Sequence, residues 1–416
     1  MYASTAPLQY LFGVLTWFRE LIHDGPFSTV YRDPGPPQTA LKLSIADRKF
    51  AKEPHDIHKE IRLLSTLSCP NVIKLLAHDQ DSGYCRMWMP YIPHSLATLV
   101  NSPSFTAFST PDLTYGNAIL ESRFVLLSKG ILHQIFVALA YLHSHSIAHR
   151  DIKPSNVLIT EVCQVKLIDF GIAWTSSNEN DGDLWPETQT NMYTEVATGP
   201  YRAPELLFGP KTYDAFAADM WSLGATFAEY FRPLKEQADD LDEWDDERNE
   251  EAEDDQQNEP PPFIFLRNAP PTRMTSWRRL PLFDAERGDI GLAWSIFKVR
   301  GTPNETNWPD FLSLPHAKLL TFEHADPVDL RKLLPHMPAT PKNVALDGSR
   351  QKPSPLDVLD GLLLCSPSAR MTSAQALQHP WFNEEDTPLL YPDTLRKEEK
   401  LWNGHGLGYW FLEVMG

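Results

Sequence analysis

Two short strings constrain this chain more than any other feature of its sequence. Residues His149–Asn156 read HRDIKPSN, and thirteen residues later Asp169–Gly171 read DFG. Phosphoryl transfer requires a carboxylate at the attacking hydroxyl and ligands that hold a metal ion against the nucleotide phosphates. Asp151 is a candidate for the first role, and Asn156 and Asp169 carry side-chain oxygens that suit the second. The two strings therefore predict a phosphoryl-transfer centre.

Further strings follow in a fixed order along the chain. They are YRAPELLFG at Tyr201–Gly209, PLFD at Pro281–Asp284 and GTPNETNWP at Gly301–Pro309. With HRDIKPSN and DFG, this ordered set resembles the signature of eukaryotic protein kinases. Within that family the chain is most similar to the cyclin-dependent-kinase-like Ser/Thr kinases. The resemblance runs from about residue 20 to 382 and is interrupted at 233–280.

The resemblance implies an α+β, bilobal protein-kinase fold. We expect a kinase domain at 15–382, with a small β-rich N-lobe at about 15–92 and a larger, mainly helical C-lobe at about 93–382. An N-terminal extension, 1–14, would precede it and a C-terminal tail, 383–416, would follow. A length of 416 residues suits one such domain with insertions.

Local patterns predict several elements of the two lobes. Phe27–Tyr31 and Thr39–Leu43 have the composition of strands. Apolar residues recur at a helical period in His55–Leu67 and in Ile131–His143. Residues 219–231 are too apolar for a surface helix and predict a buried central helix of the C-lobe.

Most of the net charge of −18 comes from one segment. Residues 235–259 contain fourteen acidic residues against Lys235 and Arg248, which is −12 of the total. An acidic chain lacks the lysines and arginines that phosphate contacts require, so we expect no nucleic-acid partner. The acidic run ends in three prolines, and 235–262 is predicted to be a disordered insertion. It is either a solvated spacer or a docking segment for a basic partner.

The sequence favours an intracellular location. Four cysteines lie far apart without a Cys-x-x-Cys pair, which is typical of a reducing compartment. No apolar run approaches the roughly 18–20 residues of a membrane span, and Met1–Phe18 has no basic start. We therefore expect a protein of the cytoplasm, the nucleus or both, without a membrane partner.

The resemblance also implies the roles of individual residues. Lys42, paired with Glu60, would bind the phosphates of ATP, while Asn156 and Asp169 would hold Mg²⁺. Lys153 would neutralise the transferring phosphate, and Thr198 would brace Asp151; both indicate transfer to Ser or Thr. Further nucleotide-binding positions are Gly25, Val30, Ala40, Met89, Ile92 and Leu158. Glu205 with Arg370, and Asp219, match buried structural positions of the family.

The glycine-rich loop departs from the family pattern. His23, Gly25 and Ser28 stand where three glycines are expected, and Pro26 has no N–H to offer a phosphate. A lost hydrogen bond to a charged group is worth about 1.5–3 kcal/mol, so we expect weakened ATP binding. Pro26 and Phe27 also replace the inhibitory Thr-Tyr phosphosites of cyclin-dependent kinases.

Two regulatory features are altered as well. In the cyclin-binding helix, His58 replaces the apolar residue on which a cyclin packs, which argues against cyclin dependence. Of the three arginines that clamp the family's activation-loop phosphothreonine, Arg150 alone remains, with Lys59 and Trp174 at the other two positions. Thr194 resembles the phosphosite, but its predicted receptor is weak.

These departures resemble the monomeric fungal CDK-activating kinases, which phosphorylate the activation loops of other cyclin-dependent kinases. The resemblance implies a monomer that uses ATP and Mg²⁺ on a protein substrate, a cyclin-dependent kinase. One alternative is another cyclin-dependent or mitogen-activated-like kinase with unrelated substrates. A second is a pseudokinase scaffold. Retention of all the catalytic polar residues favours an enzyme over the scaffold.

Overall fold

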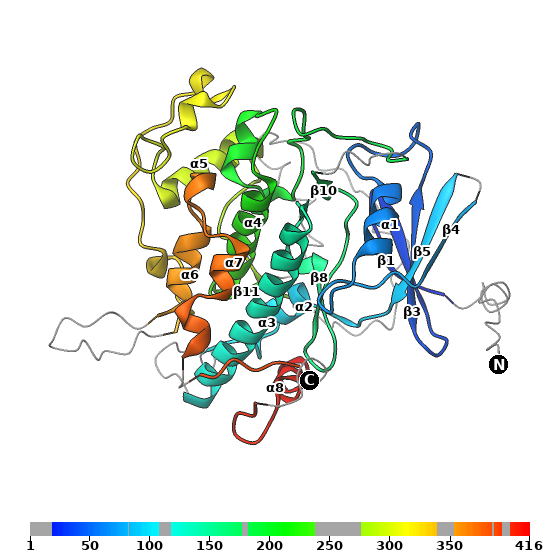
Figure 1. Ribbon diagram of the computed structural model, residues 1–416. Helices are drawn as coiled ribbons and strands as arrows, with labels where there is room; N and C mark the ends of the chain where they lie inside the picture. The colour runs from blue at the N-terminus through cyan, green and yellow to red at the C-terminus, as the bar shows by residue number, and fades with distance from the viewer. Residues whose placement is uncertain are drawn as a thin grey trace, which may run out of the picture.

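The structure is a computed structural model that describes residues 19–81, 83–107, 118–176, 182–237, 276–338, 353–384, 387–392 and 400–416. The predicted N-terminal extension, 1–14, lies outside these residues. So does the predicted acidic insertion from residue 238 onward. The described chain forms two lobes, a sheet-rich one and a helical one (Figure 1).

The N-lobe is an antiparallel five-stranded sheet with one helix beside it. The strand order is β1-β2-β3-β5-β4. The strands are β1 (Glu20–Asp24), β2 (Ser28–Asp33), β3 (Thr39–Ile45), β4 (Ala77–Asp81) and β5 (Tyr84–Pro90). Helix α1 (Ile57–Thr66) begins where the Asp56 carboxylate accepts hydrogen bonds from the N–H groups of His58 and Lys59.

The C-lobe is built around two long helices, α3 (Ala118–Ser144) and α4 (Ala215–Glu229). The other α-helices of the described C-lobe are α2 (Leu96–Val100), α5 (Gly288–Arg300), α6 (Pro355–Leu362), α7 (Ser373–Leu377) and α8 (Leu407–Met415). Short strands form three small sheets: β6 (His94–Ser95) with β8 (Val157–Ile159) and β9 (Val165–Leu167), β7 (Ile147–Ala148) with β10 (Trp174–Thr175), and β11 (Leu234–Gln237) with β12 (Ser276–Arg279). This two-lobed α+β architecture is the predicted one.

The predicted elements agree with the observed ones in type. The two predicted strands correspond to β2 and β3, and the predicted helices to α1, α3 and α4. The apolar composition of α4 follows from its position, because every residue of this helix except Phe216 is buried. Helix α3 begins at Ala118, so it extends further toward the N-terminus than the predicted helical segment Ile131–His143.

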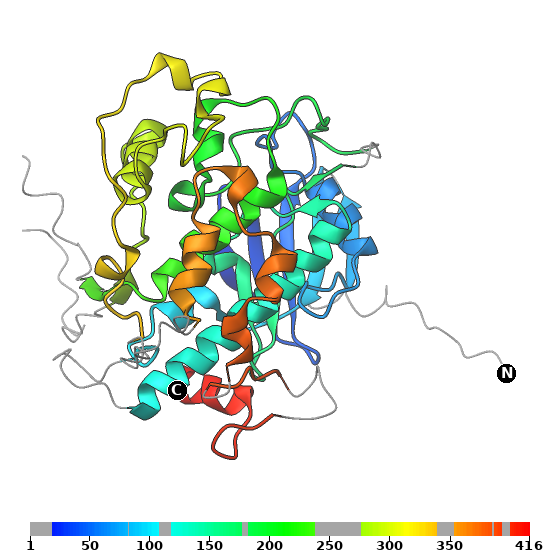
Figure 2. The same cartoon turned by 60° about the vertical axis from the view of Figure 1, so that its left-hand side comes forward.

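Helix α3 has the length and composition of a membrane span over Leu120–Ser144, which the sequence analysis did not anticipate. In the fold, 78% of its most apolar window is buried within the protein. Figure 2 shows it running through the C-lobe between other helices. Packing inside the lobe therefore accounts for its composition.

The end of the chain contributes to the C-lobe core. Leu407 and Phe411 of α8 are completely buried and belong to the same apolar cluster as the side chains of α3. The two helices contact each other (Figures 1 and 2). Gly130 of α3 permits this approach, since a Cβ atom there would lie 3.0 Å from a methyl group of Leu407. The predicted tail thus includes a helix that packs as part of the lobe.

A β-ladder joins the described residues on either side of 238–275. Strands β11 and β12 pair antiparallel, with Leu234 opposite Arg279 and Gln237 opposite Ser276. Residues 235–237, which the sequence analysis placed in a disordered insertion, are therefore in a strand. The pairing places Gln237 directly opposite Ser276, so the described residues that flank 238–275 are neighbours.

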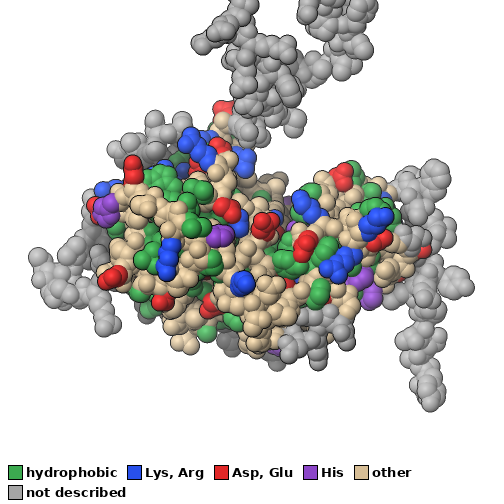
Figure 3. All heavy atoms as spheres, turned by 90° about the horizontal axis from the view of Figure 1, so that it is seen from above, with side chains coloured by type: hydrophobic (Ala, Val, Ile, Leu, Met, Phe, Trp, Pro, Cys, Tyr) green, Lys and Arg blue, Asp and Glu red, His purple; other side chains and the backbone are tan. Residues whose placement is uncertain are grey.

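Outside residues 235–259 the chain has a formal charge of only −6, since 35 basic residues oppose 41 acidic ones. On the face in Figure 3, basic and acidic side chains are interspersed over both lobes. The strong acidity of the protein is thus a local property of one segment.

A buried ion pair ties the activation segment, which runs from the DFG string at Asp169–Gly171 to Ala203–Glu205, to the rest of the C-lobe. The two terminal nitrogens of Arg370 donate to the two carboxylate oxygens of Glu205 at 2.9 and 3.0 Å. Both residues are buried, and Arg370 also donates to the carbonyl oxygens of Ala217 and Leu364. This is the pair that the resemblance implied.

We expect Arg370→Ala to lower the free energy of unfolding by about 3–5 kcal/mol, because it leaves the Glu205 carboxylate buried without its cation. Urea denaturation followed by tryptophan fluorescence measures the change. Arg86→Gln is the control, since Arg86 and Asp79 form an ion pair with side chains 37% and 47% exposed. It should cost about 0–1 kcal/mol. An equal loss of unfolding free energy in the two variants would show that the buried pair of Arg370 with Glu205 has no special structural role.

Candidate active site

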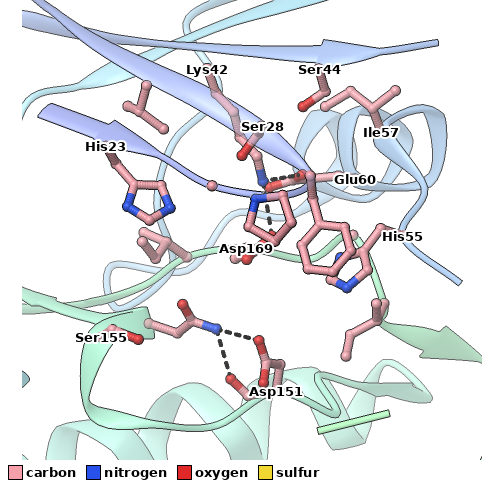
Figure 4. A pocket seen from close by; sticks show the side chains of 18 of the residues that line it. His23, Ser28, Lys42, Ser44, His55, Ile57, Glu60, Asp151, Ser155 and Asp169 are labelled. Carbon is pink, nitrogen blue, oxygen red and sulfur yellow. Dashed lines mark hydrogen bonds and ion pairs between the residues drawn. The ribbon is translucent and has the colours of Figure 1, made fainter. Parts of the chain in front are cut away.

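The predicted site residues meet in one cavity between the lobes. It has a volume of about 700 Å³ and lies between the N-lobe sheet and the catalytic loop, His149–Asn156 (Figure 4). Every residue predicted to serve catalysis, nucleotide or metal lines it: Gly25, Val30, Ala40, Lys42, Glu60, Met89, Ile92, Asp151, Lys153, Asn156, Leu158, Asp169 and Thr198. These residues come from segments up to 173 positions apart, so the fold rather than local sequence assembles the site.

The buried carboxylate of Asp219 holds the backbone of the catalytic loop in place. Asp219 of α4 accepts hydrogen bonds from the backbone N–H groups of His149, at 2.8 Å, and Arg150, at 2.6 Å. Arg150 has a positive φ of 65°, an unfavourable conformation for a residue with a side chain. The two bonds to Asp219 stabilise this backbone and so set the direction in which Asp151, the next residue, leaves the loop.

Three side chains hold the carboxylate of Asp151 in place. Its Oδ1 accepts a hydrogen bond from the hydroxyl of Thr198 at 2.8 Å, and its Oδ2 accepts one from the Asn156 amide at 2.8 Å. The ammonium group of Lys153 lies 2.9 Å from Oδ2 and donates to the Thr198 oxygen at 2.7 Å. An oriented carboxylate of this kind can receive the hydroxyl of a substrate and accept its proton.

Lys42 joins the N-lobe to the metal-binding end of the site. Its Nζ lies 2.7 Å from Glu60 of α1 and 2.9 Å from Asp169 (Figure 4). Burial alone would lower the pKa of Lys42, but the two carboxylates outweigh it and raise that pKa well above its ordinary value. Burial would likewise raise the pKa of Asp169, yet Lys42 holds it well below its usual range. The Lys42–Asp169 pair is therefore ionised at neutral pH.

Asn156 and Asp169 have the chemistry to hold a divalent cation. Cations such as Mg²⁺ prefer oxygen ligands, and carboxylates above all. The Asn156 amide nitrogen donates both to the backbone oxygen and to the side chain of Asp151, so its amide oxygen remains for a metal. Asp169 is ionised and uses only Oδ1 in its bond with Lys42. The residues present fit the metal that a kinase domain implies.

Apolar side chains of neighbouring strands form the other end of the cavity. Ala40 of β3 stands opposite Met89 of β5 in the sheet, and Val30 of β2 stands opposite Lys42. Ile92 follows β5, and Leu158 lies on β8 beneath. An apolar lining next to charged groups suits a nucleotide, whose base is apolar on both faces and whose phosphates are anionic.

The altered glycine loop is a tight hairpin whose tip is held by aromatic contacts. The N–H of Gly25 donates to the carbonyl oxygen of Ser28 at 3.0 Å. The ring of Phe27 stacks on His55 with centroids 3.5 Å apart, and the ammonium of Lys52 lies 5.2 Å from the Phe27 ring. The sequence analysis did not foresee this contact. Weakened ATP binding by the loop stays a prediction.

The sequence analysis did not identify Glu187, which contacts the catalytic loop. Glu187, in the activation segment, binds the guanidinium of Arg150, at 2.8 Å through Nη1, and lies 3.4 Å from the ammonium of Lys59. Trp174, the third predicted receptor position, instead lies on β10 and contacts Phe216. No motif spacing identifies Glu187, because an acidic residue in this segment is ordinary.

Fold and site together define a phosphotransferase with the architecture of the protein kinases. The family description "Protein kinase domain" matches residues 19–382, so the chain belongs to the protein kinase family. The chain is 28% identical over 374 residues to "Cell division control protein 2 homolog 3" of Trypanosoma brucei brucei, covering 88% of this chain and 91% of that protein. It is 29% identical over 270 residues to "Cyclin-dependent kinase 20" of Danio rerio, covering 65% of this chain and 56% of that protein. The protein is a Ser/Thr protein kinase similar to cyclin-dependent kinases.

We expect Thr198→Ala to lower kcat by about 10–100-fold. The variant removes a hydrogen bond to a charged group, worth about 1.5–3 kcal/mol, and each 1.36 kcal/mol is tenfold in rate. Thr198→Ser keeps the hydroxyl and should retain most of the rate. Steady-state kinetics on a Ser/Thr peptide measure both, and equal activity of Thr198→Ala and wild type would show that the bridge to Asp151 is dispensable.

Proposed function

We propose that this kinase works as a monomer without a cyclin, and that it phosphorylates the activation-loop threonine of cyclin-dependent kinases. Its place of action would be the cytoplasm or the nucleus. The observation that carries the proposed autonomy is that α1 is held by the chain's own activation segment. The proposed substrate rests on the resemblance to monomeric CDK-activating kinases.

Four contacts join residues 182–185 to α1 and the residues before it. The Nδ1 atom of His58 donates to the carbonyl oxygen of Gly182 at 3.0 Å. The guanidinium of Arg62 binds Asp183 through both carboxylate oxygens, at distances of 2.8–3.2 Å. Trp185 is largely buried, and its backbone N–H and indole N–H donate to Asp56 and to the carbonyl oxygen of His55.

These contacts bear directly on cyclin dependence. A kinase needs α1 near the N-lobe sheet so that Glu60 can orient Lys42. His58 stands at the position where a cyclin would pack, and here it binds residue 182 of the same chain. The chain thus supplies from within the contacts that a partner helix or loop would supply in a cyclin-dependent enzyme. The name of the Trypanosoma brucei brucei relative refers to cell division control, and the name of the Danio rerio relative refers to a cyclin.

The proposed chemistry follows from the geometry of the site. Asp151 orients the substrate threonine and accepts its proton, while Lys153 stabilises the charge on the transferred phosphate. Asn156 and Asp169 would hold Mg²⁺, which neutralises phosphate charge when bound. Lys42 would position the phosphates of ATP. No step requires a group from a second chain.

We expect the purified chain alone to phosphorylate a catalytically inactive cyclin-dependent kinase on its activation-loop threonine. Asp151→Asn should abolish the transfer, because it removes the carboxylate at the attacking hydroxyl while keeping the size of the side chain. Phosphate incorporation from labelled ATP and mass spectrometry of the product measure the reaction.

The controls separate the two parts of the proposal. A substrate whose activation-loop threonine is replaced by alanine should not be labelled. Transfer to Ser/Thr peptides but not to the inactive kinase would reject the proposed substrate and leave the autonomy standing. An increase of tenfold or more on adding a cyclin would reject the autonomy.

A further inference from the structure

A single carboxylate lies between the two basic residues that adjoin the catalytic residues. Glu187 is 8% exposed, and Arg150 and Lys59 are 1% and 2% exposed. Arg150 precedes Asp151, and Lys59 precedes Glu60. Two nitrogens of Arg150 bind both oxygens of Glu187, and Lys59 approaches the same carboxylate. The contact therefore links the catalytic loop, α1 and the activation segment.

The surroundings of Glu187 are built to hold an anion. Its Oε2 also accepts the backbone N–H of Tyr193 at 2.9 Å. The hydroxyl of Tyr213 accepts from Arg150 at 3.0 Å and donates to the carbonyl oxygen of Tyr193 at 2.8 Å. This arrangement fixes Arg150 and the backbone next to Thr194 around the carboxylate.

The electrostatics favour an ionised Glu187. Burial opposes its ionisation, but Arg150 and Lys59 outweigh burial and hold the pKa of Glu187 below its ordinary value. Burial lowers the pKa of Lys59, and Glu187 opposes that effect. Without the carboxylate, two cations would be buried side by side, which is strongly unfavourable.

We propose that Glu187 is a positioning residue that takes the place of an activation-loop phosphate. A phosphate on Thr194 would need Arg150 and Lys59 as its receptor, since these are the two basic residues at the receptor positions of this chain. Both already bind Glu187. The carboxylate sets Asp151 through Arg150 and α1 through Lys59, so catalysis does not require a phosphorylated Thr194.

This inference rests on the proposed autonomy and assigns part of it to one residue, Glu187. The two remain separable, because activity is measured on the best peptide from a Ser/Thr library rather than on a cyclin-dependent kinase. If the wild-type chain needs a cyclin, the autonomy fails, and every variant is then compared with that cyclin added.

We expect Glu187→Gln to lower kcat by about 10–100-fold, because it removes the charged hydrogen bonds to Arg150. The KM for the peptide should change little, since Glu187 lies outside the cavity lining. Glu187→Asp keeps the charge and should recover part of the rate. Thr194→Ala, and wild-type chain treated with phosphatase, should both keep kcat within about twofold of the untreated enzyme.

Each outcome decides the proposal. A folded Glu187→Gln variant with wild-type kcat would overturn it, as would a loss of tenfold or more in Thr194→Ala or in the dephosphorylated wild type. Thermal melting of each variant identifies a failure to fold. If Glu187→Gln does not fold, the phosphatase and Thr194→Ala experiments still support or reject the proposal on the folded chain.

Discussion

The catalytic site depends on the hydrogen bonds that the buried carboxylate of Asp219 accepts from the catalytic loop. This carboxylate is completely buried on the central helix α4, and it accepts the backbone N–H groups of His149 and Arg150. Asp151 can therefore meet Thr198, Asn156 and Lys153 only while α4 stays packed in the C-lobe. A buried anion is stable only when its hydrogen bonds are complete, so the core of the lobe and the geometry of the loop require each other.

The same constraint explains how the lobes and segments are joined. Among the described residues, ion pairs with at least one buried partner include Lys42 with Glu60 and Asp169, Arg150 with Glu187, and Arg370 with Glu205. In each, the partners come from different segments, so a displaced segment would leave an unpaired charge in a medium of low polarity. Buried pairs of this kind add little to net stability compared with apolar residues, but they specify one arrangement of the segments.

Short-range patterns predicted the parts of this protein that short-range forces decide. The catalytic loop, the central helix 219–231 and strands β2 and β3 carry their signals within about ten residues. Three features depend on distant partners instead: the contact of Glu187 with Arg150 thirty-seven residues earlier, the packing of α8 on Gly130, and the pairing of β11 with β12. No local preference encodes them, because they arise only when the lobes are assembled.

The altered glycine loop and the activation segment are linked through His55. Its ring stacks on Phe27 at the tip of the loop, and its carbonyl oxygen accepts the indole N–H of Trp185. Burial lowers the pKa of His55, which favours the neutral imidazole for stacking on an apolar ring. The loop that lost two glycines and a backbone donor is thus tied to the segment that holds α1. Under the proposal that this kinase works without a cyclin, Phe27, which stands at a family phosphosite, would also take part in the contacts that connect this loop to α1.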